Sequence, residues 1–239
     1  MKRPERENEV RLNVMVESGG PNQRRRGGSD IEAGTIDPVR RARSISSAEQ
    51  AAALYAEWAP TYDADVFGEL GFTGSARIAE LLVGVLPDPT LPVIDLGCGT
   101  GAVGRRLSQL GVTIVDGVDL SPEMLAIAAS SGAYRRLIVA DLHRLDDQSR
   151  ASYAASVSAG TFTTGHVGPE VVPRLLDLLR PEGLIAWVIA TQVWPQFEPV
   201  LATSRLAPLH KSVEAIRRDG PPEAVMFVAR VTGGSDERS

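Results

Sequence analysis

Residues 93–107 read VIDLGCGTGAVGRRL, and this stretch decides the expected fold. The apolar run VIDL has the length and composition of a buried strand, and AVGRRL can open a helix. Glycines crowd the turn between them, where the backbone must bend sharply and come close to a ligand. In an open parallel sheet, the turn after the first strand lies at the carboxyl edge, where ligands bind. The stretch therefore predicts a ligand-binding loop.

The glycines of this loop fit two kinds of ligand site. From Gly99 they spell G-x-G-x-x-G, the pattern of a dinucleotide-binding turn. From Gly97 they spell G-x-G-x-G, two residues behind Asp95. An ionised Asp95 at the strand tip would repel a pyrophosphate by roughly 4 kcal/mol at ~4 Å and an effective dielectric of about 20. A cationic ligand would be attracted instead, which favours the second pattern.

Strand-like and helix-like segments alternate from residue 89 onward. Such alternation requires right-handed crossovers and a parallel sheet covered on both faces. We expect further strands at 112–120, 135–141, 153–160 and 183–190, and helices at 101–110, 121–130 and 169–180. Residues 206–231 look like two strands joined at RDGPPE, which predicts an antiparallel hairpin at the sheet edge. The predicted fold is α/β and Rossmann-like, with a mostly parallel seven-stranded sheet.

Two helical segments precede the sheet and form a predicted lid. Ser46 and Glu49 make an S-x-x-E capping box for a helix over 46–59, and apolar spacing predicts another helix over 75–86. The chain thus divides into a disordered tail at 1–45, a helical lid at 46–88, a core at 89–232 and a disordered tail at 233–239. The first tail has few large apolar side chains, which is typical of a solvated segment. Its RRR run would be the contact if the tail bound RNA or acidic lipid.

Composition narrows the classes of function. Residues 1–45 contain ten Lys or Arg and seven Asp or Glu, while the whole chain has a net charge of −5. Residues 46–239 are therefore acidic. An acidic domain repels phosphate groups, which argues against a nucleic-acid partner. No apolar run approaches the ~20 residues that span a bilayer, and the first residues lack a signal-type apolar segment. The single cysteine, Cys98, fits a reducing cytoplasm. We expect a cytoplasmic protein without membrane association.

Two more carboxylates follow the next two predicted strands. Asp119 ends the second strand, where an acid binds ribose hydroxyls in NAD sites and in S-adenosylmethionine sites alike. Asp141 ends the third strand and could accept from an adenine amino group, for which a nicotinamide-dependent dehydrogenase has no fixed need. S-adenosylmethionine carries a sulfonium and an ammonium but no phosphate, and its carboxylate can use amides at a helix N-terminus. The acids together favour S-adenosylmethionine over NAD.

The segments VIDLGCGTG, GVDLSPEML and VADL resemble the first three motifs of class I S-adenosylmethionine-dependent methyltransferases. The resemblance covers roughly residues 50–191. Within that class, LYAEWAPTYDADV and VSAGTFTTGHVGPEVVPRLLDLLRPEGL are similar to the Williams–Beuren-region methyltransferase-like group of small-molecule methyltransferases. Two positions depart from that group: Ala154 follows Tyr153 where the group has Tyr-Asp, and Glu182 interrupts its Pro-Gly-Gly.

The resemblance implies a donor site for S-adenosylmethionine and its product S-adenosylhomocysteine. It assigns to this site Tyr62, Asp95, Gly97, Cys98, Gly99, Gly101, Asp119, Leu120, Met124, Asp141, Leu142 and Gly160. Asp119 would bind the ribose, and Met124 would lie against the adenine unless it is a core residue. Asp141 and Leu142 would hold the adenine edge.

The resemblance places the acceptor pocket between the lid and the segment after the fourth strand. Its predicted lining residues are Tyr55, Trp58, Phe162, Thr163 and His166, and Thr161 and Thr164 could also shape it. Tyr62 and His166 are the candidate catalytic residues, because an aromatic face attracts a sulfonium and a histidine can remove the acceptor proton. The alternatives are that the aromatic residues anchor the lid on the core, and that His166 caps the next helix or forms a hydrogen bond within its loop. No Asp, Glu and Asn cluster has divalent-metal spacing, so no metal is expected.

The predicted function is transfer of a methyl group from S-adenosylmethionine to a small-molecule acceptor, such as a natural product, by in-line displacement. Two alternatives stay open. One is a cyclase on the same fold that uses the bound sulfonium, and the other is a non-catalytic donor-binding or interaction module. The oligomeric state is open as well, with a homodimer as one alternative.

Overall fold

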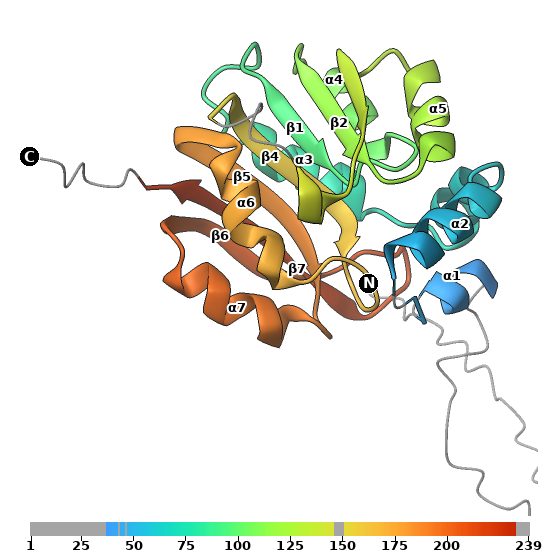
Figure 1. The fold of residues 1–239 in the computed structure, drawn as a ribbon. Coiled ribbons are helices and arrows are strands. Elements are labelled where there is room, and N and C mark those ends of the chain that lie inside the picture. The colour runs from blue at the N-terminus through green and yellow to red at the C-terminus, as the bar shows by residue number, and fades with distance from the viewer. Residues whose placement is uncertain (1–36, 43, 46, 146–150, 233–239) are drawn as a thin grey trace, which may run out of the picture. The chain divides into compact units, whose positions relative to one another are not determined.

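The alternating segments form one seven-stranded sheet in the computed structural model (Figure 1). The structure describes residues 37–42, 44–45, 47–145 and 151–232, all within the unit Ile36–Ser239. The strands are β1 (Val93–Leu96), β2 (Val115–Asp119), β3 (Arg136–Val139), β4 (Tyr153–Phe162), β5 (Leu179–Ala190), β6 (Leu206–Ala215) and β7 (Pro222–Val231). The α-helices are α1 (Asp37–Ala42), α2 (Ala48–Trp58), α3 (Gly74–Val83), α4 (Ala102–Gln109), α5 (Pro122–Ser130), α6 (Val172–Asp177) and α7 (Trp194–Thr203).

The strand order is β3-β2-β1-β4-β5-β7-β6. Strands β1 to β5 pair in parallel, while β7 runs antiparallel to β5 and β6 antiparallel to β7. The Rossmann-like fold with an antiparallel C-terminal hairpin is therefore confirmed. The chain adds β2 and β3 on one side of β1 and β4 on the other, so the strand order reverses between β1 and β4. Ligands bind at the carboxyl ends of the strands at such a reversal.

Helices cover both faces of the sheet, which explains why its central strands are almost continuously apolar. On one face, α3 and α4 bury Ile78, Leu82 and Leu107 against the strands. On the other face, α6 and α7 bury Leu175 and Phe197. Every residue of β1 is buried, Asp95 included.

The N-terminal lid begins earlier than the sequence predicts. Helix α1 lies inside the segment predicted as a tail, and its Ala42 packs with Ile45 and Leu54 in a small apolar cluster. Helix α2 is capped by Ser47, whose Oγ accepts from the Gln50 amide at 3.2 Å. The predicted cap was Ser46, which lies outside the described residues, as do the rest of the predicted tails at 1–36 and 233–239. The N-cap of this helix is therefore Ser47, one residue later than predicted.

Two other helical segments differ from the prediction. The helix expected over 169–180 is a 3-10 turn, Pro169–Val171, followed by the short α6, because the chain extends into β5 from Leu179. Helix α7 was not predicted, and it contains Pro199 in its interior. Among the described residues, no helix is both long and apolar enough to cross a membrane.

Candidate active site

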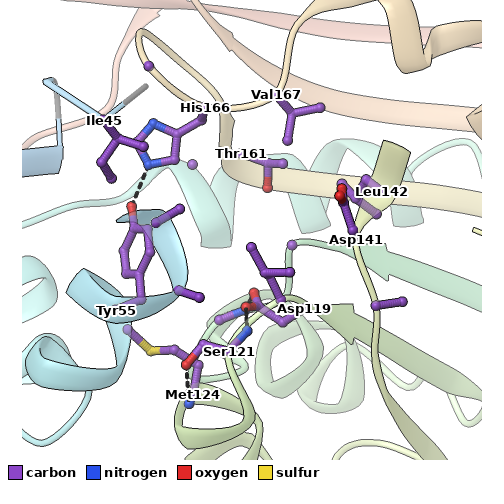
Figure 2. A pocket seen from close by; sticks show the side chains of 18 of the residues that line it. Ile45, Tyr55, Asp119, Ser121, Met124, Asp141, Leu142, Thr161, His166 and Val167 are labelled. Atoms are coloured by element: carbon purple, nitrogen blue, oxygen red, sulfur yellow. Dashed lines mark hydrogen bonds between the residues drawn. The ribbon is translucent and has the colours of Figure 1, made fainter. Parts of the chain in front are cut away.

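A cavity of about 470 Å³ lies at the carboxyl ends of β1 to β4, beneath α2 (Figure 2). Of the residues predicted from the sequence, the cavity is lined by Tyr55, Tyr62, Gly97, Gly99, Asp119, Leu120, Met124, Asp141, Leu142, Gly160 and His166. Thr161, Ser121 and His143 also line it. Figure 2 shows Tyr55 and His166 on one side and Asp141 and Leu142 on the other. One cavity thus joins the predicted donor and acceptor ends.

The glycine loop needs its glycines for two different reasons. Gly97 has φ of +67°, and a Cβ there would stand 2.2 Å from Thr161 Oγ1, so this position is closed to any side chain. Gly99 has φ of +53°, but a Cβ there would meet nothing within 4 Å. Gly99 lines the cavity, and its bare backbone leaves that side open to a ligand.

Asp95 does not face the cavity, which corrects the electrostatic argument made from the sequence. Its carboxylate lies behind the loop, where Tyr134 Oη donates to Asp95 Oδ2 at 2.7 Å. Gly104 makes room for this tyrosine, because a Cβ there would stand 2.2 Å from Tyr134 Cζ. Burial raises the pKa of Asp95 to about 7. Asp95 therefore lies inside the protein next to the glycine loop. It does not contact a ligand in the cavity.

Asp119, unlike Asp95, lines the cavity. Its Oδ2 accepts from the Gly99 amide at 2.8 Å and its Oδ1 accepts from the Ser121 amide at 2.9 Å. Burial raises the pKa of this carboxyl, while the backbone amides act in the opposite direction. Each oxygen keeps a lone pair, so the pair of oxygens can still accept from two neighbouring hydroxyl groups.

Met124 and Leu142 supply apolar surface near Asp119. Met124 is 1% exposed and stands at the start of α5, where its amide donates to the N-cap Ser121 Oγ at 3.3 Å. Leu142 is also buried, and both side chains line the cavity. A flat apolar ring could lie between such surfaces.

Asp141 is tied to a histidine that the sequence analysis did not assign to the site. Asp141 Oδ1 is 2.9 Å from His143 Nδ1 and from the His143 amide, and Glu170 Oε1 is 2.9 Å from His143 Nε2. Burial opposes protonation of His143, but the two carboxylates outweigh it and raise its pKa. Burial likewise favours neutral Asp141, and the hydrogen bonds from His143 outweigh it and lower its pKa. Asp141 is therefore held as a carboxylate at the cavity wall.

Three aromatic residues of the lid take different places. Tyr55 and Tyr62 line the cavity. Trp58 is buried outside the cavity lining, and its Nε1 donates to Asp65 Oδ2 at 2.7 Å. The Tyr62 ring packs edge-on against Trp58 with a centroid distance of 4.8 Å. Trp58 therefore packs within the lid and does not line the cavity.

Asp63 connects the lid to the glycine loop. Its carboxylate accepts from Thr100 Oγ1 and pairs with Arg105 at 3.0 Å. Arg105 also donates to the Thr100 carbonyl at 2.7 Å. The contacts of Asp63 with Thr100 and Arg105 thus hold the segment that carries Tyr62 against the glycine loop.

Several predicted residues are not brought to the cavity. Besides Asp95 and Trp58, the lining does not include Cys98, Gly101, Phe162, Thr163 and Thr164. Burial raises the pKa of the Cys98 thiol, which agrees with a space-filling role in the turn. Phe162 is 1% exposed and packs against Trp187 and Phe197, with centroid distances of 5.1 and 5.2 Å.

Replacement of Phe162 by Leu tests this placement. We expect the free energy of unfolding to fall by about 1–2 kcal/mol, because a ring in a packed aromatic cluster is replaced by a smaller side chain. Binding of S-adenosylhomocysteine should stay within about twofold of wild type, since the residue lies outside the cavity. Denaturant unfolding and calorimetry measure the two quantities. Weaker binding with unchanged stability would place Phe162 in the pocket after all.

Part of the sequence also matches a known protein family. Residues 93–183 match the family described as "Methyltransferase domain". The match begins at β1 and includes every loop at the carboxyl ends of β1 to β4. The chain carries a class I S-adenosylmethionine-dependent methyltransferase domain. The resemblance seen in the sequence is thereby confirmed.

Two curated relatives share this methyltransferase domain. The chain is 32% identical over 156 residues to human "Methyltransferase-like protein 27", covering 64% of this chain and 63% of that protein. It is 28% identical over 161 residues to "Malonyl-[acyl-carrier protein] O-methyltransferase" from Pectobacterium atrosepticum, covering 63% of this chain and 60% of that protein. The matched part is therefore less than two thirds of either relative.

A solved structure gives the same fold at low sequence identity. The [4+2]-cyclase SpnF superposes with a TM-score of 0.64 and 14% identity, covering 80% of this chain and 98% of that one. At this identity the likeness concerns the fold alone.

The residues of the methyltransferase domain fit the donor that its family implies. Gly99 leaves an open approach, Asp119 aims a carboxylate into the cavity, and Met124 offers a buried apolar wall. A nucleoside with a hydroxylated ribose and no phosphate suits this set, because the cavity lining that the structure describes contains no Lys or Arg to balance phosphate charge.

The lining residues that the sequence analysis missed are mostly small or apolar. They are Ile45, Ser47, Ala51, Ala52, Ser121, Ala140, His143, Ala159, Gly165 and Val167. Helical spacing could have found two of them, since Ala51 and Ala52 precede Tyr55 by four and three residues. Ile45 had no such signal, because it reaches the cavity only through the packing of α1 against α2.

Proposed function

We propose that the protein transfers a methyl group from S-adenosylmethionine to a small-molecule acceptor by in-line displacement and releases S-adenosylhomocysteine. The observation that carries the proposal is the single cavity that extends from Asp119 and Asp141 to Tyr55 and His166. Its volume of about 470 Å³ is in the range of small-molecule sites. Loops of the methyltransferase domain and α2 line this concave site, whose size favours a small acceptor over a macromolecular one.

When bound, S-adenosylmethionine would supply an activated methyl group on a sulfonium. Asp119 would accept from the ribose hydroxyls, and Asp141 with Leu142 would hold the adenine edge. Met124 would pack on the adenine, and the Gly97–Gly101 backbone would follow the methionine part. Tyr62 would present its ring to the cavity near the sulfonium, where an aromatic face favours a cation by ~0.5–2 kcal/mol. The chain would otherwise act by positioning its two ligands.

Labelled donor tests the proposal. The protein is incubated with methyl-labelled S-adenosylmethionine and a whole-cell extract that has been fractionated by size, and products are separated by chromatography. We expect label in a small product and stoichiometric S-adenosylhomocysteine. Donor binding with label retained on the donor would favour a cyclase or a binding module instead. Label in protein or nucleic acid would contradict the proposal of a small-molecule acceptor. It would still support methyl transfer.

A further inference from the structure

Tyr55 and His166 form a pair across the acceptor end of the cavity. Tyr55 stands on α2, and His166 lies in the loop between β4 and α6, 111 residues later. Tyr55 Oη and His166 Nε2 are 2.7 Å apart, and the rings approach with a centroid distance of 5.7 Å. Figure 2 shows this hydrogen bond, and both side chains line the cavity. The lid and the acceptor loop thus meet at a polar contact.

The partners of His166 fix the direction of this hydrogen bond. His166 Nδ1 lies 3.0 Å from the Thr164 carbonyl oxygen, which can only accept, so Nδ1 carries a proton. In the neutral ring Nε2 then holds a lone pair, and Tyr55 Oη–H donates to it. Because the hydroxyl hydrogen of Tyr55 points at the imidazole, a lone pair of Oη can accept a hydrogen bond from a ligand in the cavity.

The surroundings keep both groups neutral. Burial lowers the pKa of His166, and the hydrogen bond to Thr164 opposes it only in part. Burial raises the pKa of Tyr55, and the neighbouring Tyr62 and Asp119 raise it further. The other titratable side chains in the described cavity lining are Asp141 and His143. The proton shared between Tyr55 Oη and His166 Nε2 is therefore bound to Tyr55 in the resting protein.

Apart from Ser47 and Tyr62, the side chains around this pair are apolar. Ile45, Ala51 and Ala52 contribute from the lid, and Val167 follows His166. Lys and Arg are absent from the lining as far as the structure describes it. A carboxylate acceptor would lack a cationic partner here, whereas a neutral molecule with a hydroxyl group would find one polar pair in an apolar pocket.

We propose that Tyr55 and His166 are a proton relay for an uncharged acceptor whose reacting oxygen carries a hydrogen, such as a phenol or an enol. This inference rests on the proposed methyl transfer. The acceptor donates its hydroxyl hydrogen to Tyr55 Oη, and Tyr55 passes its own to His166 Nε2. The acceptor oxygen keeps the electron pair of its broken O–H bond and uses its lone pair for the new bond to the methyl carbon.

Charge balances in this step. One positive charge is present before transfer, on the sulfonium, and one after transfer, on the imidazolium, while the departing donor becomes a neutral thioether. The imidazolium keeps both partners, since Nδ1 still donates to Thr164 and Nε2 now donates to Tyr55 Oη. Tyr55 is thus the catalytic residue of the pair, and His166 acts through it as a positioning residue that stores the proton.

Magnetic resonance of isotope-labelled histidine tests the resting state without any acceptor. The chain contains three histidines, so substitution of His143 and His210 by Gln assigns all signals. With S-adenosylhomocysteine present, we expect His166 to be neutral and protonated at Nδ1. Tyr55→Phe should change the Nε2 shift of His166, whereas the matched Tyr62→Phe should not. A His166 protonated at Nε2 in the wild-type protein would overturn the relay.

Kinetics with the acceptor found by labelled donor tests the step itself. We expect Tyr55→Phe and His166→Gln each to lower kcat by about 100-fold or more, with KM and the Kd of S-adenosylhomocysteine changed by less than about threefold. The wild-type rate should fall toward acidic pH as His166 is protonated, and His166→Gln should lose this dependence. A rise in KM at unchanged kcat would show a lid contact only and overturn the relay.

The fate of the label separates this inference from the function on which it rests. Label recovered only as a carboxylic ester would overturn the relay and leave methyl transfer intact. Absence of any labelled product from a donor-binding protein would overturn both.

Discussion

Replacement of Asp119 by Ala should weaken the binding of S-adenosylhomocysteine by at least about 100-fold. The carboxylate would accept from ribose hydroxyls, and charge-assisted hydrogen bonds in a partly dry site are worth about 1.5–3 kcal/mol each. A 100-fold loss corresponds to about 2.7 kcal/mol. The change also leaves the Gly99 and Ser121 amides without their partner, which loosens the glycine loop and acts in the same direction. Titration calorimetry measures the affinity.

Asp88→Ala is the matched control for this prediction. Asp88 makes the same type of contact, because its carboxylate accepts from the Thr90 amide at 2.8 Å, but it lies outside the cavity lining. This variant should bind S-adenosylhomocysteine as the wild type does. Thermal unfolding of both variants separates lost binding from lost structure. A folded Asp119→Ala protein with affinity within about threefold of wild type would remove Asp119 from the donor site.

Ionisation of Asp95 should make the protein less stable as pH rises. The folded pKa of about 7 lies above the ordinary 3.8 because burial disfavours the charged form. The folded state therefore binds more protons than the unfolded state between these values, and the free energy of unfolding falls as pH rises through that window. The difference between the two values corresponds to about 4 kcal/mol. Asp95 Oδ1 has no hydrogen-bond partner among the described residues, and it adds to this cost when charged.

Asp95→Asn should remove this pH dependence. Tyr134 can still donate to the amide oxygen of Asn, and the neutral side chain has no charge to bury. Between about pH 5 and about pH 8, the stability of the variant relative to wild type should increase by roughly 3 kcal/mol. Urea unfolding at several pH values measures it, with Asp88→Asn as the control. Parallel pH profiles for wild type and Asp95→Asn would contradict a buried, proton-binding Asp95.

The fold could be predicted because its information is local. Apolar runs, turn glycines and helix periodicity recur along the chain, and right-handed crossovers leave few ways to join them. Helix α7 was missed since Pro199 and Pro195 interrupt the helical pattern, and the cap moved to Ser47 because neighbouring serines compete for one position. Such errors shift element ends without changing the sheet order.

Asp119 and Asp141 could be placed at the cavity from sequence because each lies at the carboxyl end of a strand, where the ligand edge of the sheet is. Asp95 could not be oriented in this way. It lies in a strand buried on both faces, and only Tyr134, which Gly104 admits, shows that its carboxylate points behind the loop. The same holds for Phe162, which the sequence placed beside the acceptor but which packs between Trp187 and Phe197.

The sequence by itself determined the parallel sheet, the glycine loop and the two acids at its edge, because strand tips and turn residues are set by neighbours along the chain. Only the tertiary structure decided that Tyr55 donates to His166, that His143 bridges Asp141 and Glu170, and that Ile45 reaches the cavity. Tyr55 and His166 are 111 residues apart in the chain, and His143 and Glu170 are 27 residues apart. Their geometry follows from how helices and loops pack on the sheet, and no local pattern encodes it.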